Sequence, residues 1–160
     1  MEFINVYYDF IYRTEENLRT IQGLAKSDNS KAFEVTQLIN SLLGLIVLPK
    51  EKELIRGSDT LQRLEKDGWI LPRRTGGNAK VSTLLQLVRQ MRHGIAHWNI
   101  QFHSKNKAIV EIQIENRWKK MRKGKQEEVF EWGGAFTVDA LHNFVIRLAD
   151  LSKNRAANLK

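Results

Sequence analysis

The chain has no cysteine among its 160 residues, and it has no long uninterrupted apolar segment. The absence of thiols excludes a disulfide framework and a thiolate zinc site, and it permits a reducing compartment. The longest apolar run, residues 42–48, is far shorter than the roughly 20 residues that a membrane-spanning helix needs. The opening residues MEFINVYYDF have no basic cluster, so we expect no secretory signal and no membrane association. These features together predict a cytoplasmic protein.

Acidic side chains are in the minority, with 18 Asp and Glu against 26 Lys and Arg, which gives a net charge of +8. The isoelectric point of about 9.8 favours an anionic partner such as nucleic acid or a membrane surface. A basic protein without an anionic partner is the alternative. The length suits a single domain over residues 1–160, with its core at about residues 3–152.

Apolar residues recur at helical spacing along most of the chain. The helices predicted from this spacing cover about residues 3–24, 31–48, 58–68, 82–97 and 137–152. Ser82 and Thr137 are the expected N-caps of the last two helices, and Pro49 is expected to end the second. Residues 72–78, which are rich in Pro, Gly and Asn, are predicted to form a loop.

The periodicity changes beyond Trp98, where apolar and polar residues begin to alternate. Alternation over residues 100–102, 110–115 and 130–132 predicts two or three short antiparallel strands, and Gly133 and Gly134 break this pattern. The predicted fold class is therefore mainly α. It is a bundle of four to five helices with a small antiparallel β-hairpin insertion, at about residues 99–133, between the last two helices.

Arg92, His93 and His97 form a motif at the end of an apolar helix, in a chain that has only four histidines. An arginine supplies a fixed positive charge and a histidine can exchange a proton near neutral pH, which is the combination that phosphodiester cleavage needs. Five residues turn an ideal helix by about 140°, so Arg92 and His97 share a face only if the helix loosens near Gly94 or Arg92 reaches round. The alternative is that the helix dipole favours a histidine near the C-terminus, which accounts for His97, and that Arg92 is only a solvated side chain.

The string LVRQMRHGIAHWN, which holds this motif, resembles the signature of HEPN domains (higher eukaryotes and prokaryotes nucleotide-binding). That signature is an arginine, a polar residue, about three further positions and a histidine, and Arg92, His93 and His97 fit it in order. Residues 10–18 and 34–40, with the run 44–49, resemble the first two helices of a bacterial branch. The resemblance covers most of residues 3–150 and implies that the predicted bundle is HEPN-like.

The resemblance implies an endoribonuclease that needs no metal or other cofactor and acts as a homodimer, with two motifs sharing one composite site. His97 would act as general acid or base around the ribose 2′-hydroxyl, and Arg92 would stabilise the charge on the phosphorane. The products would end in 2′,3′-cyclic phosphate, and DNA would be spared because it lacks the 2′-hydroxyl. By the same analogy the protein would be a toxin or defence effector, and an antitoxin or regulatory protein is a possible partner.

Two other classes of function remain open. The first is a non-catalytic HEPN-like helical module that binds RNA or a protein partner and keeps the motif for dimerisation. The second is a DNA-binding accessory protein. One branch of the family is silenced by nucleotidylation of a tyrosine two residues after the histidine, and Asn99 at that position argues against this control here.

Several polar residues are candidates for supporting the site. His93 would fill the polar position of the motif and hydrogen-bond His97 or the partner subunit, although its spacing from His97 also allows both to bind one metal ion. Asn40 lies beside a polar stripe on the second helix, and Arg13 and Asn17 are four residues apart on the first. A hydrogen-bonded core network or a solvated helix face explains these three residues equally well.

A basic run at residues 117–125 is the predicted RNA-binding element, as a loop between strands. Its contacting residues would be Arg117, Trp118, Lys119, Lys120, Arg122 and Lys123. The cations would hold the RNA backbone and Trp118 would stack on a base. The alternative is a charged hairpin tip that blocks edge-to-edge association. Arg73, Arg74 and Lys80 could also touch phosphate.

Overall fold

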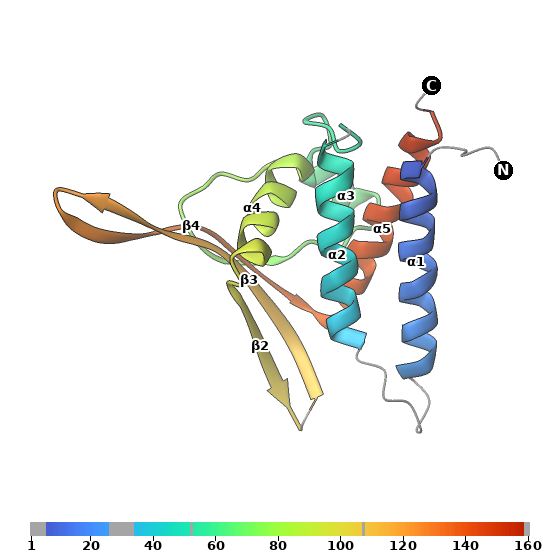
Figure 1. Ribbon diagram of the computed structural model, residues 1–160, viewed down its shortest axis with the longest axis horizontal. Coiled ribbons are helices and arrows are strands. Elements are labelled where there is room, and N and C mark those ends of the chain that lie inside the picture. Colours follow the sequence, from blue (N-terminus) through green and yellow to red (C-terminus); the bar gives the residue numbers. More distant parts are fainter. Residues whose placement is uncertain (1–5, 26–33, 52, 107, 159–160) are drawn as a thin grey trace. The chain divides into compact units, whose positions relative to one another are not determined.

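The computed structural model of the chain describes residues 6–25, 34–51, 53–106 and 108–158. In order, the elements of this part of the chain (Figure 1) are α1 (Val6–Ala25), α2 (Glu34–Glu51), α3 (Leu61–Lys66), β1 (Arg73–Gly76), α4 (Leu84–Ala96), β2 (Ile100–Lys105), β3 (Ala108–Arg122), β4 (Lys125–Thr137) and α5 (Val138–Ala156). None of the described helices has the length and apolar character needed to cross a membrane.

The chain divides into two compact units. The first comprises Met1–Arg56 and His142–Lys160, and the second comprises Gly57–Leu141. A single domain over residues 1–160 stays a prediction.

The first unit is helical, because α1, α2 and the larger part of α5 each bury one apolar stripe. Its fully buried side chains include Ile11, Leu18, Leu38, Leu42, Leu45, Ile46, Phe144, Val145 and Leu148. Glu15 is buried with them at 4 % exposure, and it forms ion pairs with Lys153 of α5 and, at 2.6 Å, with Arg19 of α1. Burial alone would raise the pKa of Glu15, but the hydrogen bonds from these two cations hold it below its ordinary value.

The second unit is built on a four-stranded antiparallel sheet in the order β1-β4-β3-β2. Helix α4 packs on one face of β3, where Ile112 and Ile114 are fully buried. Contact is close because Gly94 of α4 has no side chain: a Cβ there would lie 2.6 Å from Ile114 Cγ2 and 2.8 Å from the Glu115 carbonyl oxygen. In Figure 1 the far ends of β3 and β4 extend beyond α4 as a long hairpin.

The prediction of a mainly α bundle with one small hairpin is wrong, because the sheet has four strands and two of them are 15 and 13 residues long. Strand β1 lies inside the segment predicted to be a loop, and Gly133 and Gly134 lie within β4 instead of ending a strand. The turn-forming composition hid β1 and the C-terminal part of β4. Gly133 pairs with Glu115 of β3, and a β-carbon on it would meet the Thr75 hydroxyl at 2.5 Å.

Smaller corrections concern the ends of the helices. Helix α2 continues past Pro49 to Glu51, since the φ that proline fixes is itself helical. The N-cap of α4 is Thr83, not Ser82, and its hydroxyl accepts from the backbone N–H of Gln86 in a capping box. Thr137 is confirmed as the N-cap of α5, accepting from Ala140 N at 3.1 Å. The predicted start of the second helix at Lys31 lies outside the described residues.

Candidate functional site

One side of α4 is polar along its length, opposite the buried apolar stripe of the same helix. Leu84, Val88, Met91 and Ile95 are buried, as their helical spacing predicts. The polar side chains on the other side comprise Gln86, Arg89, Gln90, His93 and His97, and each lies three or four residues from at least one other. This spacing places them on one stripe of the helix.

The C-terminus of α4 is fixed against the sheet through its capping residues. His97 is the C-cap, and the backbone N–H groups of Trp98 and Asn99 return to the carbonyls of Ile95 and Gly94 at 3.0 and 2.8 Å. This is a Schellman motif, which normally has glycine where Trp98 stands with φ +56°. Asn99 also binds β3, because its carbonyl accepts from Glu115 N and its side chain donates to the Arg117 carbonyl, each at 3.0 Å.

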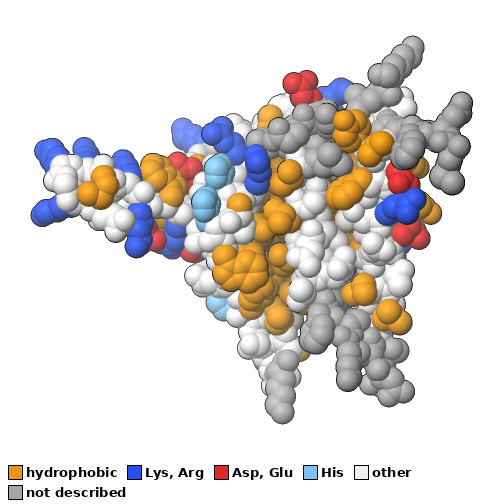
Figure 2. Space-filling model, in the orientation of Figure 1, with side chains coloured by type: hydrophobic (Ala, Val, Ile, Leu, Met, Phe, Trp, Pro, Cys, Tyr) orange, Lys and Arg blue, Asp and Glu red, His pale blue; other side chains and the backbone are white. Residues whose placement is uncertain are grey.

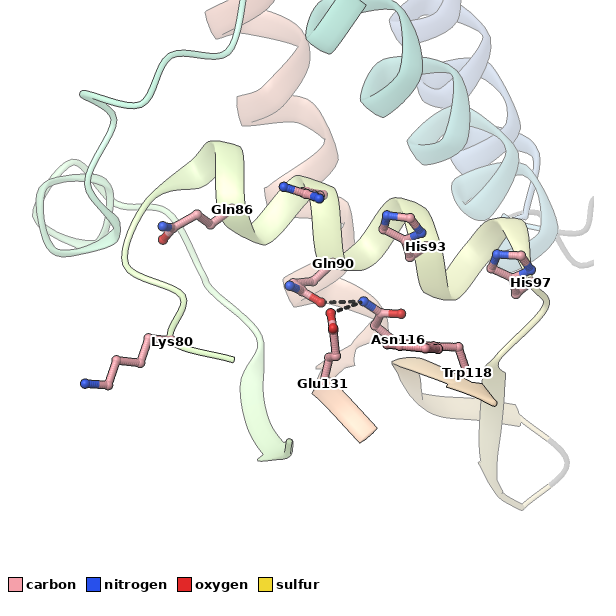
Figure 3. A pocket seen from close by; sticks show the side chains of 9 residues that line it. Lys80, Gln86, Gln90, His93, His97, Asn116, Trp118 and Glu131 are labelled. Atoms are coloured by element: carbon pink, nitrogen blue, oxygen red, sulfur yellow. Dashed lines mark hydrogen bonds between the residues drawn. The ribbon is translucent and has the colours of Figure 1, made fainter. Parts of the chain in front are cut away.

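An open pocket of about 610 Å³ lies between this stripe and the strands (Figure 3). Its lining residues are Lys80, Gln86, Arg89, Gln90, His93, His97, Asn116, Trp118 and Glu131. The loop before α4 contributes Lys80, β3 contributes Asn116 and Trp118, and β4 contributes Glu131. The pocket therefore combines two imidazoles, two fixed cations, one carboxylate and an indole.

The two imidazoles lie parallel along one wall of the pocket, with ring centroids 6.4 Å apart and an interplanar angle of 7°. Partial burial lowers the pKa of His93, and the nearby charges of Arg89, His97 and Arg92 lower it further. The lowered pKa favours the neutral form of His93, in which one ring nitrogen is a hydrogen-bond acceptor.

Asn116 organises the polar floor of the pocket. Its side-chain nitrogen donates to Gln90 Oε1 at 2.6 Å and to Glu131 Oε2 at 3.1 Å (Figure 3). Glu131 lies at a β-bulge, because Asn116 pairs with Trp132 and Arg117 with Phe130, which leaves Glu131 without a partner in β3. Bulges of this kind redirect a side chain beside a functional site.

The loop between β1 and α4 holds the bulge from the other side. The backbone N–H of Ala79 donates to the Glu131 carbonyl at 2.8 Å. The approach needs Gly77, which has φ +90° and on which a β-carbon would overlap the Glu131 backbone. Because Lys80 directly follows Ala79, the same contact places Lys80 at the edge of the pocket.

Arg92 does not line the pocket with His97. Helix α4 stays regular to Ala96, so the turn of about 140° between the two positions is not relaxed. Arg92 is half-buried on the neighbouring side of α4, near enough for its charge to lower the pKa of His93. Within this chain, Arg89 is the arginine that shares the pocket with both histidines.

The three supporting residues predicted on the first two helices belong to the other compact unit. Arg13, Asn17 and Asn40 all have exposed side chains, and Arg13 pairs with Asp9 at 2.8 Å. Their support of the site stays a prediction.

The basic run is not a loop, because β3 continues to Arg122 and only Lys123 and Gly124 turn the chain. Strand alternation divides the predicted RNA-binding residues between two faces. Trp118, Lys120 and Arg122 lie on the face that continues from Asn116 and the pocket, and Arg117 and Lys119 lie on the reverse face. Figure 2 shows Lys and Arg side chains along this hairpin and histidine side chains at the surface beside its base.

Arg117 has a structural role within the hairpin. Its guanidinium bonds Glu115 at 2.5 Å and Glu128 at 3.5 Å, and it lies 3.8 Å from the centre of the Phe130 ring. The hydrogen bond from Arg117 is the main reason that the pKa of Glu115 is lowered. Phosphate contact by Arg117 would have to compete with these interactions.

Sequence reasoning missed Arg89, Gln90, Asn116 and Glu131 as pocket residues. A signal for Arg89 was present, since it precedes His93 and His97 by four and eight residues. Asn116 and Glu131 carried no local signal, because strand pairing and a bulge bring them to α4. In the described residues, no three His, Asp or Glu side chains gather as a candidate metal site.

The second unit thus presents a histidine-lined basic pocket between a capped helix and a long β-hairpin. A family model described as HEPN pEK499 p136 matches residues 3–159. The chain therefore belongs to this HEPN family. Neither the comparison with curated proteins nor the comparison with solved structures gives a match.

Proposed function

We propose that the protein is an endoribonuclease that cleaves RNA without a metal ion, by attack of the ribose 2′-hydroxyl on the adjacent phosphate. The observation that carries the proposal is the parallel His93–His97 pair on an open pocket that also holds Arg89 and Lys80. HEPN domains are often ribonucleases, so membership in the family supports the same reaction class. A toxin or defence role, inside the cytoplasm, is the biological context that the family suggests.

In the proposed reaction, one imidazole takes the proton of the 2′-hydroxyl while a second group returns a proton to the leaving 5′-oxygen. The neutral state of His93 suits it to accept a proton, and His97 stands beside it as the histidine of the family motif. The cations Arg89 and Lys80 would offset the charge that builds on the phosphorane. The attack closes a 2′,3′-cyclic phosphate, and the 5′-hydroxyl product leaves with the returned proton.

Arg92 has a different place in this proposal. Because it lies on the neighbouring side of α4, it would act at a composite site that a second copy of the chain completes. The proposed active form is therefore a homodimer, and light scattering that finds only monomer under assay conditions would contradict it.

The experiment is cleavage of single-stranded and structured RNA in excess chelator by the wild-type protein and by single-alanine variants. We expect His97→Ala to lower the cleavage rate by a factor of about 100 or more, in the range of general acid–base catalysis. His103→Ala is the matched control, because His103 is an exposed residue of β2 outside the pocket. Comparing Arg89→Ala with Arg92→Ala shows which arginine the reaction uses.

Two results would contradict the proposal. Cleavage that survives in His97→Ala would show that this histidine is not used. Equal RNA binding by all variants, with no cleavage by any, would favour a non-catalytic RNA-binding module.

The hairpin can be tested separately from the chemistry. We expect Lys120→Glu to weaken RNA binding more than Lys119→Glu, because only Lys120 shares the face of Trp118 and the pocket. The two variants change charge equally on adjacent residues, so total charge cannot explain a difference. Equal weakening, measured by fluorescence anisotropy at fixed salt, would show that the pocket face is not the RNA track.

A further inference from the structure

Phosphate binding alone does not explain why the pocket is lined by the carboxylate of Glu131. A carboxylate in the same pocket as Arg89 and Lys80 repels the RNA backbone and lowers its affinity. Within the described residues, the hydrogen-bond partner of this carboxylate is the neutral amide of Asn116, and no lysine or arginine pairs with it. We therefore expect the ligand of this pocket to have a group that donates hydrogen bonds to the carboxylate.

The orientation of the surrounding amides follows from hydrogen-bond chemistry. A carboxylate only accepts, so Asn116 must turn its nitrogen toward Glu131, and the same nitrogen donates to the oxygen of Gln90. Gln90 then has its own NH₂ group available to donate to a ligand. The floor of the pocket consequently offers an acceptor pair on Glu131 and a donor on Gln90 (Figure 3).

Among the four RNA bases, one has the matching edge. Guanine carries two adjacent donors, N1–H and N2–H₂, followed by the acceptor O6 on its Watson–Crick edge. Adenine and cytosine each place an acceptor beside their amino group, and uracil has a single donor between two acceptors. A carboxylate can accept both guanine donors together, which it cannot do with the other bases.

The remaining lining residues suit the rest of a guanine nucleotide. The indole of Trp118 lies at the pocket wall, where a base can stack on it. Lys80 and Arg89 can bind the attached phosphate, and the histidine pair lies along the same helix. Base and phosphate sites are therefore both present in one pocket.

We propose that this pocket is a guanine-recognition site in which Glu131, aimed by the β-bulge, binds N1–H and N2–H₂ while Gln90 binds O6. The inference deepens the proposed ribonuclease function: it makes the enzyme selective for RNA cut next to guanosine. Asn116 acts as a positioning residue, since it bonds both recognising side chains and need not touch the base.

The first test is calorimetric binding of nucleoside monophosphates to the full-length wild-type protein. We expect GMP to bind at least about tenfold more tightly than AMP, CMP or UMP, since a bidentate contact discriminates by about that much. IMP, which lacks the N2 amino group, should fall between GMP and AMP. Equal affinities for all five nucleotides would overturn the inference, and this result needs no variant.

Glu131→Gln tests the recognising residue, because it keeps the shape and the contact with Asn116 but loses the second acceptor. We expect it to bring the affinity for GMP to within about twofold of that for AMP. Glu127→Gln on the same strand is the control for loss of one charge, since Glu127 lies at the exposed hairpin and outside the pocket. A GMP preference that survives in Glu131→Gln would overturn the assignment.

Sequencing the ends of RNA fragments separates this inference from the proposed function. Cuts that cluster next to guanosine in the wild type and lose this preference in Glu131→Gln support both. Cuts without base preference would overturn guanine recognition and leave the ribonuclease standing. Selective GMP binding by a protein that cuts no RNA would overturn the ribonuclease and support the guanine site.

Discussion

Gly94 sets how closely α4 can approach β3, so replacing it with alanine tests the packing that builds the pocket. Alanine in place of glycine within a helix normally stabilises by about 0.8–1 kcal/mol. At residue 94 the added methyl group would lie 2.6 Å from Ile114 Cγ2 and 2.8 Å from the Glu115 carbonyl. Overpacking costs about 1–3 kcal/mol. The upper part of that range applies, because the carbonyl belongs to a strand paired on both sides and cannot rotate away.

The net expectation for Gly94→Ala is a loss of about 1–2 kcal/mol in the free energy of unfolding. For a chain of this size, that loss lowers the melting temperature by about 2–8 °C. Circular dichroism at increasing temperature measures it directly. Because α4 carries both histidines, the fractional loss in the rate of RNA cleavage should exceed the fractional loss in the free energy of unfolding.

Gly23→Ala is the matched control, since Gly23 is also in a helix but a methyl group added there would have no neighbouring atom within 4 Å. We expect it to raise the free energy of unfolding by up to about 1 kcal/mol. If Gly94→Ala were as stable as Gly23→Ala, the close packing of α4 on β3 would be refuted.

Three further predictions concern stability. The lowered pKa of His93 means that the folded state resists its protonation, so the free energy of unfolding should fall as pH drops below about 6.5. His93→Gln should reduce this fall, as measured by urea unfolding at pH 5.5 and 7.5. An equal fall in the variant and the wild type would refute the prediction. Glu15→Gln should lower the free energy of unfolding by about 1–3 kcal/mol at pH 7, while Glu16→Gln, at an exposed position, should leave it almost unchanged. Because the pKa of Glu15 is lowered, the greater stability of the wild type should diminish as pH falls below about 4.5. Trp98→Gly should stabilise by about 0.5–1 kcal/mol, since it relieves a left-handed residue that is 70 % exposed, and an unchanged melting temperature would contradict the strain.

The helices were predictable because their periodicity is local. Leu84, Val88 and Met91 are separated by three or four residues and are buried on one side of α4, as the sequence alone indicates. The alternation around Ile112 and Ile114 likewise marked β3. Its continuation into the hairpin was missed because the basic residues 117–125 were interpreted as a loop between strands, although cross-strand pairs such as Lys120 with Glu127 extend the ladder.

The pocket was only half predictable, for geometric reasons. His93 and His97 come from one helix, and their spacing of four residues already places them on one face. The expected convergence of Arg92 and His97 needed a loosened helix or an Arg92 side chain that reaches round. Helix α4 instead remains regular and Arg92 does not line the pocket, which leaves Arg89 as the arginine in the pocket. Glu131 reaches the site through a bulge between distant strand positions, and sequence spacing does not encode such a register shift.

The central claim is that the 2′-hydroxyl of RNA is the nucleophile at the histidine-lined pocket. The direct measurement is single-turnover cleavage, in excess chelator, of an RNA strand and of the DNA strand of the same sequence, with product ends identified by mass spectrometry. We predict RNA fragments that end in 2′,3′-cyclic phosphate and intact DNA. Cleavage of both strands, or of neither, would contradict the claim.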